Sequence, residues 1–146
     1  MTKEQIYMDI AKLISKRSKC SRSKVGSIIV KDDHIISTGY NGTPTSNQNC
    51  CDVFKDRPSS EHFEWSKIHE IHAEQNAILW ASINSFSIEG ADIYTTMRPC
   101  IQCTKLIIGA KLKRIYYSID YRKELHLNTI QEKFLSDNGV ELIHIP

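Results

Sequence analysis

The stretch "DIYTTMRPCIQCTKLIIGAKLKRIYYSI", residues 92–119, decides which fold this sequence predicts. Its two ends, residues 92–97 and 114–119, are short runs rich in β-branched and aromatic side chains, which favour strands. Between them, residues 101–110 predict a helix that ends at Gly109. Strands that alternate with helices are typical of an α/β sandwich with a partly parallel sheet.

The residues before this stretch predict a helix and a hairpin. Thr2 can cap the helix, with Gln5 completing a capping box, and the helical pattern fades near Ser18. Residues 25–30 and 35–40 then predict two strands joined by a tight turn.

The remaining segments are a long loop and further alternating elements. Residues 41–60 are loop-like in composition, and a loop of this length in a compact domain is usually functional or held in place by something. Residues 61–84 predict helix with a break near His72. A helix over 129–139, closed by Asn138-Gly139, and a last strand over 140–145 complete the chain. We expect one domain, 1–146.

Composition excludes some classes of protein. The chain has 146 residues, with 19 Lys and Arg against 17 Asp and Glu, a net charge of +2. This balance does not predict a nucleic-acid-binding protein. The N-terminal residues lack the apolar run of a signal peptide, and no stretch approaches the roughly 20 apolar residues of a membrane span. We therefore expect a cytoplasmic protein, in the host cytoplasm if a phage encodes it, with no membrane partner.

The charges are nevertheless unevenly distributed. No acidic residue lies between Asp9 and Asp32. The basic residues concentrated there are Lys12, Lys16, Arg17, Lys19, Arg22 and Lys24. Such a stretch is either a solvated helix face or a local attraction for an anion such as phosphate.

Two of the five cysteines lie where a metal could bind. In a reducing compartment clustered cysteines favour metal binding or catalysis over disulfides. Cys100 and Cys103 open a predicted helix, where positions i and i+3 share a face and the helix N-terminus lowers the thiol pKa. Alone, the pair fits a redox couple, half of a zinc ribbon or two core thiols.

A second helix start carries His72 and Glu74. If both helix starts lie at one edge of the sheet, His72, Cys100 and Cys103 supply three ligands, and three ligands with an open fourth position are typical of catalytic zinc. Glu74 would carry protons beside it. His-x-Glu followed by Pro-Cys-x-x-Cys is the signature of zinc-dependent nucleobase deaminases, and both halves are intact at 72–74 and 99–103.

Within that superfamily the chain resembles the deoxycytidylate (dCMP) deaminases, particularly the short phage-type enzymes. The resemblance rests on "SKVGSIIV", "IISTGYNGTP", "NCCD", "EWSKIHEIHAEQNAIL", "IEGADIYTT" and "PCIQC". It implies a three-layer α/β/α sandwich with a five-stranded mixed sheet, and zinc-dependent hydrolysis of dCMP to dUMP and ammonia, which supplies thymidylate synthesis. The stretch between "NCCD" and "HAE" is short beside some phage members.

The resemblance also implies a second, structural zinc site. Its matched ligands are Cys20, Cys50, His62 and Glu70, with His69 as the competing fourth ligand. The alternative is that the two cysteines are ordinary buried thiols and that His62 lies on the surface. Cys51 is expected to serve packing.

Substrate contacts follow from the same resemblance. The substrate-binding residues that it implies are Asn41, Ser23, Lys24, Tyr121 and Ala73, with the phosphate near Ser23, Lys24 and Tyr121. Asn41 is otherwise a turn residue, since Asn-Gly is a common turn pair, and Tyr121 is otherwise a partly buried aromatic.

Regulation and assembly are likewise expectations from the family. Its members are activated by dCTP with Mg²⁺, inhibited by dTTP and usually hexameric, so these effectors and a homohexamer are expected. Two alternatives remain. One is another zinc deaminase, acting on dCTP, on free cytidine or deoxycytidine, or on tRNA adenosine. The other is a non-catalytic zinc-binding module, in which Glu74 would be replaceable.

Overall fold

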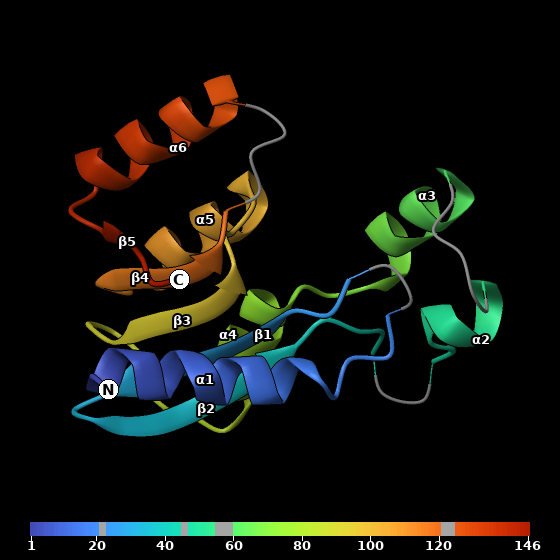
Figure 1. The fold of residues 1–146 in the computed structure, drawn as a ribbon, viewed down its shortest axis with the longest axis horizontal. Coiled ribbons are helices and arrows are strands. Elements are labelled where there is room, and N and C mark those ends of the chain that lie inside the picture. The colour runs from blue at the N-terminus through green and yellow to red at the C-terminus, as the bar shows by residue number, and fades with distance from the viewer. Residues whose placement is uncertain (21–22, 45–46, 55–59, 121–124) are drawn as a thin grey trace.

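The computed structural model describes residues 1–20, 23–44, 47–54, 60–120 and 125–146, in which one five-stranded sheet has the order β2-β1-β3-β4-β5 (Figure 1). The strands are β1 (Gly26–Lys31), β2 (His34–Tyr40), β3 (Asp92–Met97), β4 (Arg114–Ile119) and β5 (Glu141–His144). The helices are α1 (Lys3–Ser15), α2 (Cys50–Phe54), α3 (Ser60–His69), α4 (Ala73–Ile83), α5 (Ile101–Gly109) and α6 (Leu125–Asp137).

The sheet is mixed, as predicted. β1 pairs antiparallel with β2 and β3, whereas β3, β4 and β5 run parallel to one another. The β3-α5-β4 unit quoted above forms one of the two parallel pairs. Parallel strands place the starts of their following helices at one edge of the sheet, which brings the cysteine pair of α5 to that edge.

Helices cover both faces of the sheet, because neighbouring strand residues point to opposite sides. On one face Ile29, Ile93 and Ile115 pack in a core cluster with α4, α5 and α6. On the other, Ile28 and Tyr94 pack in a second cluster with α1. The predicted three-layer α/β/α sandwich is therefore confirmed.

Several local predictions are confirmed by the element boundaries. Thr2 and Gln5 form the capping box at the start of α1. The helical stretch 61–84 is interrupted where expected, since α3 ends at His69 and α4 begins at Ala73. Gly139 has a left-handed φ of 69° just after α6.

Other local predictions were wrong. Residues 41–60 are not all loop, because α2 forms from Cys50; it has five residues, too few to show a helical period. α6 begins at Leu125, not at 129. By contrast, α5 ends at Gly109, as predicted, and the left-handed residue that follows is Lys111, with a φ of 60°. No helix in the described part of the chain could span a membrane.

The position of α4 depends on Gly39 of β2. A Cβ atom there would collide with the carbonyl oxygen of Ala73 and the backbone nitrogen of Ala77. We expect Gly39→Ala to lower the free energy of unfolding by about 1–3 kcal/mol, because neither backbone atom can move aside cheaply. Urea denaturation measures this change.

Gly109 provides the matched control for that substitution. In the part of the chain that the structure describes, no atom outside this helix's own backbone and the neighbouring residues lies within 4 Å of the place that a Cβ atom at Gly109 would take. Gly109→Ala is therefore expected to leave stability unchanged or to raise it by roughly 0.5–1 kcal/mol. Equal effects at the two glycines would contradict the close approach of α4 to β2.

Candidate metal centres and active site

The first cluster of metal-ligating side chains joins the starts of α4 and α5. His72, Cys100 and Cys103 each offer a ligand atom, and these atoms lie within 4.8 Å of one another. His72 Nδ1 is 3.3 Å from Cys103 Sγ and 3.6 Å from Cys100 Sγ. A tetrahedral zinc ion with ordinary Zn–N and Zn–S bonds separates such atoms by about 3.6 Å. The donor atoms present therefore fit one zinc ion.

Local backbone structure fixes these ligands. The side-chain oxygen of Gln75 accepts a hydrogen bond of 2.8 Å from the backbone nitrogen of His72, which precedes the first turn of α4. Cys100 is the N-cap of α5, and its sulfur accepts from the backbone nitrogen of Cys103 at 3.4 Å. Sequence spacing alone thus brings both sulfurs to one side of α5.

The electrostatics of this cluster favour a thiolate at Cys100. A hydrogen bond from Cys103, supported by one with His72, lowers the pKa of Cys100 to about 4. The hydrogen bond with Cys100 in turn raises the pKa of His72. The hydrogen bond to Cys100 and burial raise the pKa of Cys103. One sulfur is therefore held in the charged form that binds metal.

Glu74 lies in the first turn of α4, beside the cluster but outside the group of ligand atoms. Only 4% of this residue is exposed, and burial raises the pKa of its carboxyl above the usual range. A buried carboxyl with a raised pKa is suited to hold and release a proton near neutral pH.

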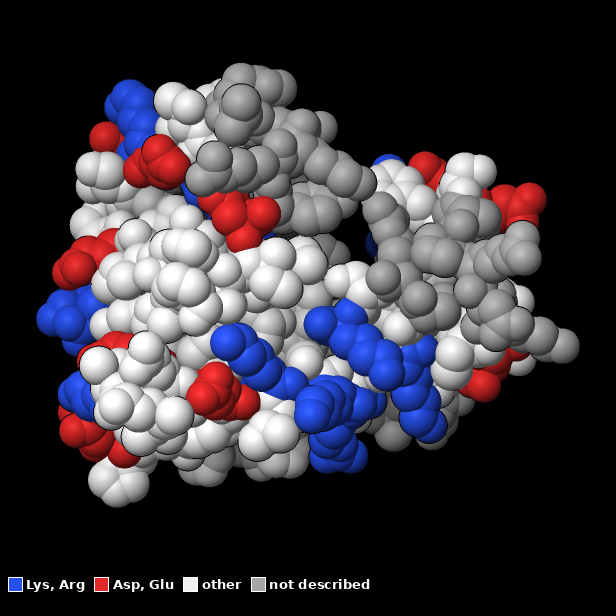
Figure 2. Space-filling model, viewed as in Figure 1, with Lys and Arg blue, Asp and Glu red and all other residues white. Residues whose placement is uncertain are grey.

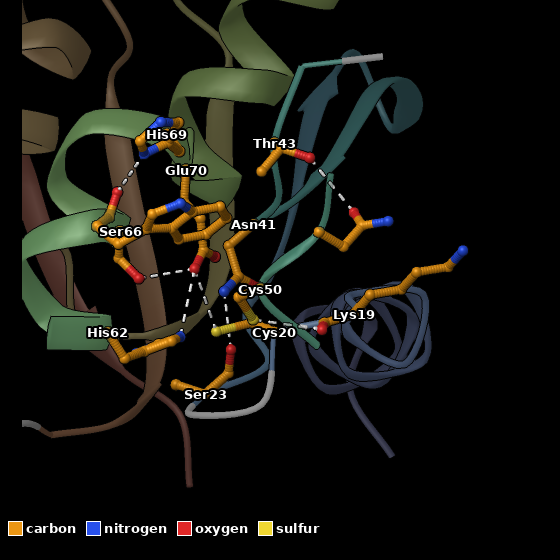
Figure 3. Close-up of polar contacts among 12 residues, drawn as sticks. Lys19, Cys20, Ser23, Asn41, Thr43, Cys50, His62, Ser66, His69 and Glu70 are labelled. Carbon is orange, nitrogen blue, oxygen red and sulfur yellow. Dashed lines mark hydrogen bonds and ion pairs between the residues drawn. The ribbon is translucent and has the colours of Figure 1, made fainter. Parts of the chain in front are cut away.

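A second cluster holds four donors: Cys20, Cys50, His62 and Glu70, whose ligand atoms also lie within 4.8 Å of one another. Glu70 Oε1 is 3.7 Å from Cys20 Sγ and 3.7 Å from His62 Nε2 (Figure 3). The alternative interpretation placed His62 on the surface, and this is wrong because His62 is fully buried. Four protein donors are typical of a closed, structural zinc site.

Glu70, rather than His69, faces this cluster. The hydroxyl of Ser66 donates to Glu70 Oε1 at 2.7 Å and orients the carboxylate. His69 instead stacks on Trp65 with 4.6 Å between ring centroids, and its Nδ1 lies 2.9 Å from the Trp65 carbonyl oxygen. The geometry favours Glu70 as the fourth donor.

The second cluster links segments that the core does not hold. Among the side chains that the structure describes, none of α2 or α3 belongs to either core cluster, and Figure 1 shows both helices projecting beyond the edge of the sheet. The four donors come from the segment after α1, the start of α2, the first turn of α3 and the residue after α3. An ion there would fasten these segments together.

Asn41 holds the segment that precedes β1. Its Oδ1 accepts from the backbone nitrogen of Val25 at 2.8 Å, and its Nδ2 donates to the carbonyl oxygen of Ser23 at 2.7 Å. Lys24, between them, is exposed. The side chain of Asn41 thereby fixes the backbone that presents two of the predicted phosphate contacts.

The structure describes only some of the other predicted substrate residues. Ala73 is fully buried at the start of α4. Tyr121 and Arg22 lie outside the described residues. Figure 2 shows basic side chains gathered near the C-terminal end of α1. Sequence reasoning missed two buried polar residues close to Cys100. Gln131 contacts the carbonyl oxygen of Pro99, and Arg98 contacts Gln131. Arg98 could have been noticed as a charge directly before Pro99.

Comparisons with known proteins agree with this architecture. The family model for the cytidine and deoxycytidylate deaminase zinc-binding region matches residues 1–119. The deoxycytidylate deaminase of enterobacteria phage T4 is 36% identical to this chain, in an alignment that covers 99% of this chain and 90% of that protein. The probable deoxycytidylate deaminase of Drosophila melanogaster is 36% identical, over 98% of this chain and 72% of that one.

A solved structure gives the same result. The dCMP deaminase of cyanophage S-TIM5, in complex with dCMP and dUMP, superimposes with a TM-score of 0.79 and 35% identity, over 97% of this chain and 96% of that chain. The resemblance found in the sequence is confirmed, and the chain belongs to the family of cytidine and deoxycytidylate deaminases that carry a zinc-binding region.

Proposed function

We propose that this protein is a zinc-dependent deaminase that hydrolyses dCMP to dUMP and ammonia, and so supplies dUMP for thymidylate synthesis. The observation that carries the proposal is the buried carboxyl of Glu74 beside the donor cluster of His72, Cys100 and Cys103. Relatives named deoxycytidylate deaminases at about a third identity over almost the whole chain support the choice of substrate.

Each residue of the site has a role in this reaction. His72, Cys100 and Cys103 would hold the zinc, which when bound supplies a water molecule acidic enough to act as nucleophile at neutral pH. Glu74 accepts the proton released as water adds to carbon 4 of cytosine. It passes this proton to ring nitrogen 3, and then transfers the second proton, from the hydroxyl group now on carbon 4, to the amino group that leaves as ammonia. Burial of Glu74 keeps bulk water from competing for these protons.

We assign the binding of the nucleotide part of the substrate to five residues. The assigned contacts are Asn41, Ser23, Lys24, Tyr121 and Ala73. Asn41 supports the assignment by fixing the backbone on both sides of Lys24. The basic side chains near the end of α1 (Figure 2) favour binding of a phosphate there.

We assign a structural role to the cluster of Cys20, Cys50, His62 and Glu70, and therefore expect about two zinc ions per chain. Cys50→Ser should lower the count to about one and reduce the melting temperature, because the ion fastens α2 and α3. Metal analysis of the purified protein and thermal denaturation measure both effects.

Cys51→Ser is the matched control for that variant. Cys51 is adjacent and half-buried, and it lies outside the four-donor cluster. The Cys51→Ser variant should keep both zinc ions. A count near one ion per chain in zinc-replete wild-type protein would contradict the structural site.

We also propose the regulation and assembly that the family membership suggests: activation by dCTP with Mg²⁺, inhibition by dTTP, and a homohexamer. Rates of dCMP deamination measured with each effector, together with the molar mass by light scattering, test these points. Rates that respond to neither nucleotide would contradict the regulatory proposal.

Ammonia release across four substrates tests the main proposal. The substrates are dCMP, dCTP, deoxycytidine and a tRNA anticodon stem. We expect dCMP to give the highest catalytic efficiency. A preference for another substrate would identify the corresponding alternative deaminase. No release from any of them by zinc-replete protein would identify a non-catalytic zinc-binding module.

A further inference from the structure

A chain of hydrogen bonds leads from Arg98 through α6 to the loop that carries Cys100. Arg98 Nε donates to Gln131 Oε1 at 2.7 Å. Gln131 Nε2 donates to the carbonyl oxygen of Pro99 at 2.6 Å and to Thr104 Oγ1 at 2.8 Å. Thr104 Oγ1 then donates to the carbonyl oxygen of Cys100 at 2.8 Å. The backbone on both sides of the Pro99–Cys100 bond is therefore held from behind.

The side chain of Gln131 suits this place for a chemical reason. Its oxygen faces a guanidinium, which only donates, and its nitrogen faces two oxygens that accept. Gln131 is 2% exposed and Thr104 is fully buried. Because losing a partner in such a site leaves a buried polar group unsatisfied, the network has one low-energy arrangement.

Arg98 is itself fixed by several contacts. Its Nη2 donates to Glu132 Oε1 at 3.0 Å, and its Nη1 lies 3.6 Å from Asp120 Oδ1. Its guanidinium lies over the ring of Tyr117, 5.5 Å from the centroid. The start of this hydrogen-bond relay, which consists of Arg98, Gln131 and Thr104, is thus anchored both to α6 and to the end of β4.

We propose that Gln131 is a positioning residue, which, with Thr104, sets the orientation of Cys100 and thereby the geometry and affinity of the first metal cluster. This inference rests on the proposed function of that cluster. Residues that hold metal ligands in place from outside the ligand set commonly alter metal affinity or activity by about 10–100-fold when they are replaced. None of the three relay side chains belongs to either group of ligand atoms.

The test uses the cobalt-substituted protein, because cobalt–thiolate absorption reports the geometry of the ligand set directly. Cys100→Ser serves as the reference variant, so that the difference spectrum isolates the first cluster from the second. Zinc affinity of the same cluster is measured by competition with a chromophoric chelator. Both measurements are independent of turnover.

Gln131→Leu keeps the size of the side chain but removes every hydrogen bond. We expect it to change the cobalt difference spectrum and to weaken zinc binding by about 10–100-fold. The kcat for dCMP should fall while KM changes little, since no relay residue is assigned to the substrate. Leu135→Ala is the control, because it removes a buried core contact of the same helix. It should lower stability and leave the spectrum unchanged.

The pair Thr104→Ser and Thr104→Val decides the matter even if Gln131→Leu does not fold. Serine keeps the hydroxyl and should keep the wild-type spectrum and zinc affinity. Valine is isosteric but lacks the hydroxyl, and should change the cobalt spectrum and weaken zinc binding. Wild-type spectra and affinity in Thr104→Val, or the same loss in Leu135→Ala, would overturn the inference. If the wild-type protein and Cys100→Ser show the same cobalt–thiolate absorption, the proposed metal cluster would be overturned as well.

Discussion

Replacing Glu74 by glutamine is expected to lower the turnover of dCMP by about 10²–10⁴-fold, the contribution typical of a positioned proton carrier. Glutamine has nearly the same shape and fills the same buried place in α4, but it cannot take up the proton that water must lose. Because Glu74 lies outside the ligand group, the variant should keep its metal. Single-turnover rates and metal analysis on the same preparation measure the two properties.

Glu70→Gln is the matched control, because Glu70 is a carboxylate of the second cluster only four residues away. It should lose about one zinc ion per chain and some stability, while the rate per folded molecule falls far less than in Glu74→Gln. Wild-type-like turnover in Glu74→Gln would exclude Glu74 as the proton carrier. Loss of metal together with activity would instead make it a ligand.

Removing the phosphate from the substrate is also expected to have a large effect. Hydrogen bonds to a charged group contribute about 1.5–3 kcal/mol each, and each 1.4 kcal/mol or so corresponds to tenfold in rate. If Lys24, the hydroxyl of Ser23 and Tyr121 all contact the phosphate, deoxycytidine should lose several powers of ten in kcat/KM relative to dCMP. Parallel assays at low salt, where screening of exposed charges is weakest, measure the ratio.

Lys24→Ala separates a direct contact from general attraction. It should weaken the reaction of dCMP and leave the residual rate on deoxycytidine nearly unchanged. Lys16→Ala removes one exposed charge from the same basic stretch, at the end of α1, and should have a smaller effect. Equal use of deoxycytidine and dCMP would mean that the basic stretch is a solvated face and that the free nucleoside is the substrate.

Local sequence was sufficient for features that depend on neighbours along the chain. The Thr2–Gln5 capping box and the interruption before α4 could both be predicted, because each depends on residues within one turn of a helix. The placement of Cys100 and Cys103 on one side of α5 could be predicted for the same reason. The α2 helix was missed because its five residues are too few for periodicity, and its position is tied to a cluster of distant donors.

The motifs of the sequence by themselves determined the family, the sheet with its parallel β3-α5-β4 unit, and which residue types could form a metal cluster. Tertiary structure decided between the alternatives that those motifs left open. His69 and Glu70 are adjacent in the chain, yet only Glu70 faces Cys20 and His62, because the last turn of α3 directs His69 onto Trp65. Gln131 was invisible to motif reasoning, because its partners lie 27 and 32–33 residues away and only the packing of α6 beside α5 unites them. Short-range contacts are encoded by spacing, whereas contacts between distant segments depend on how the whole sheet and its helices pack.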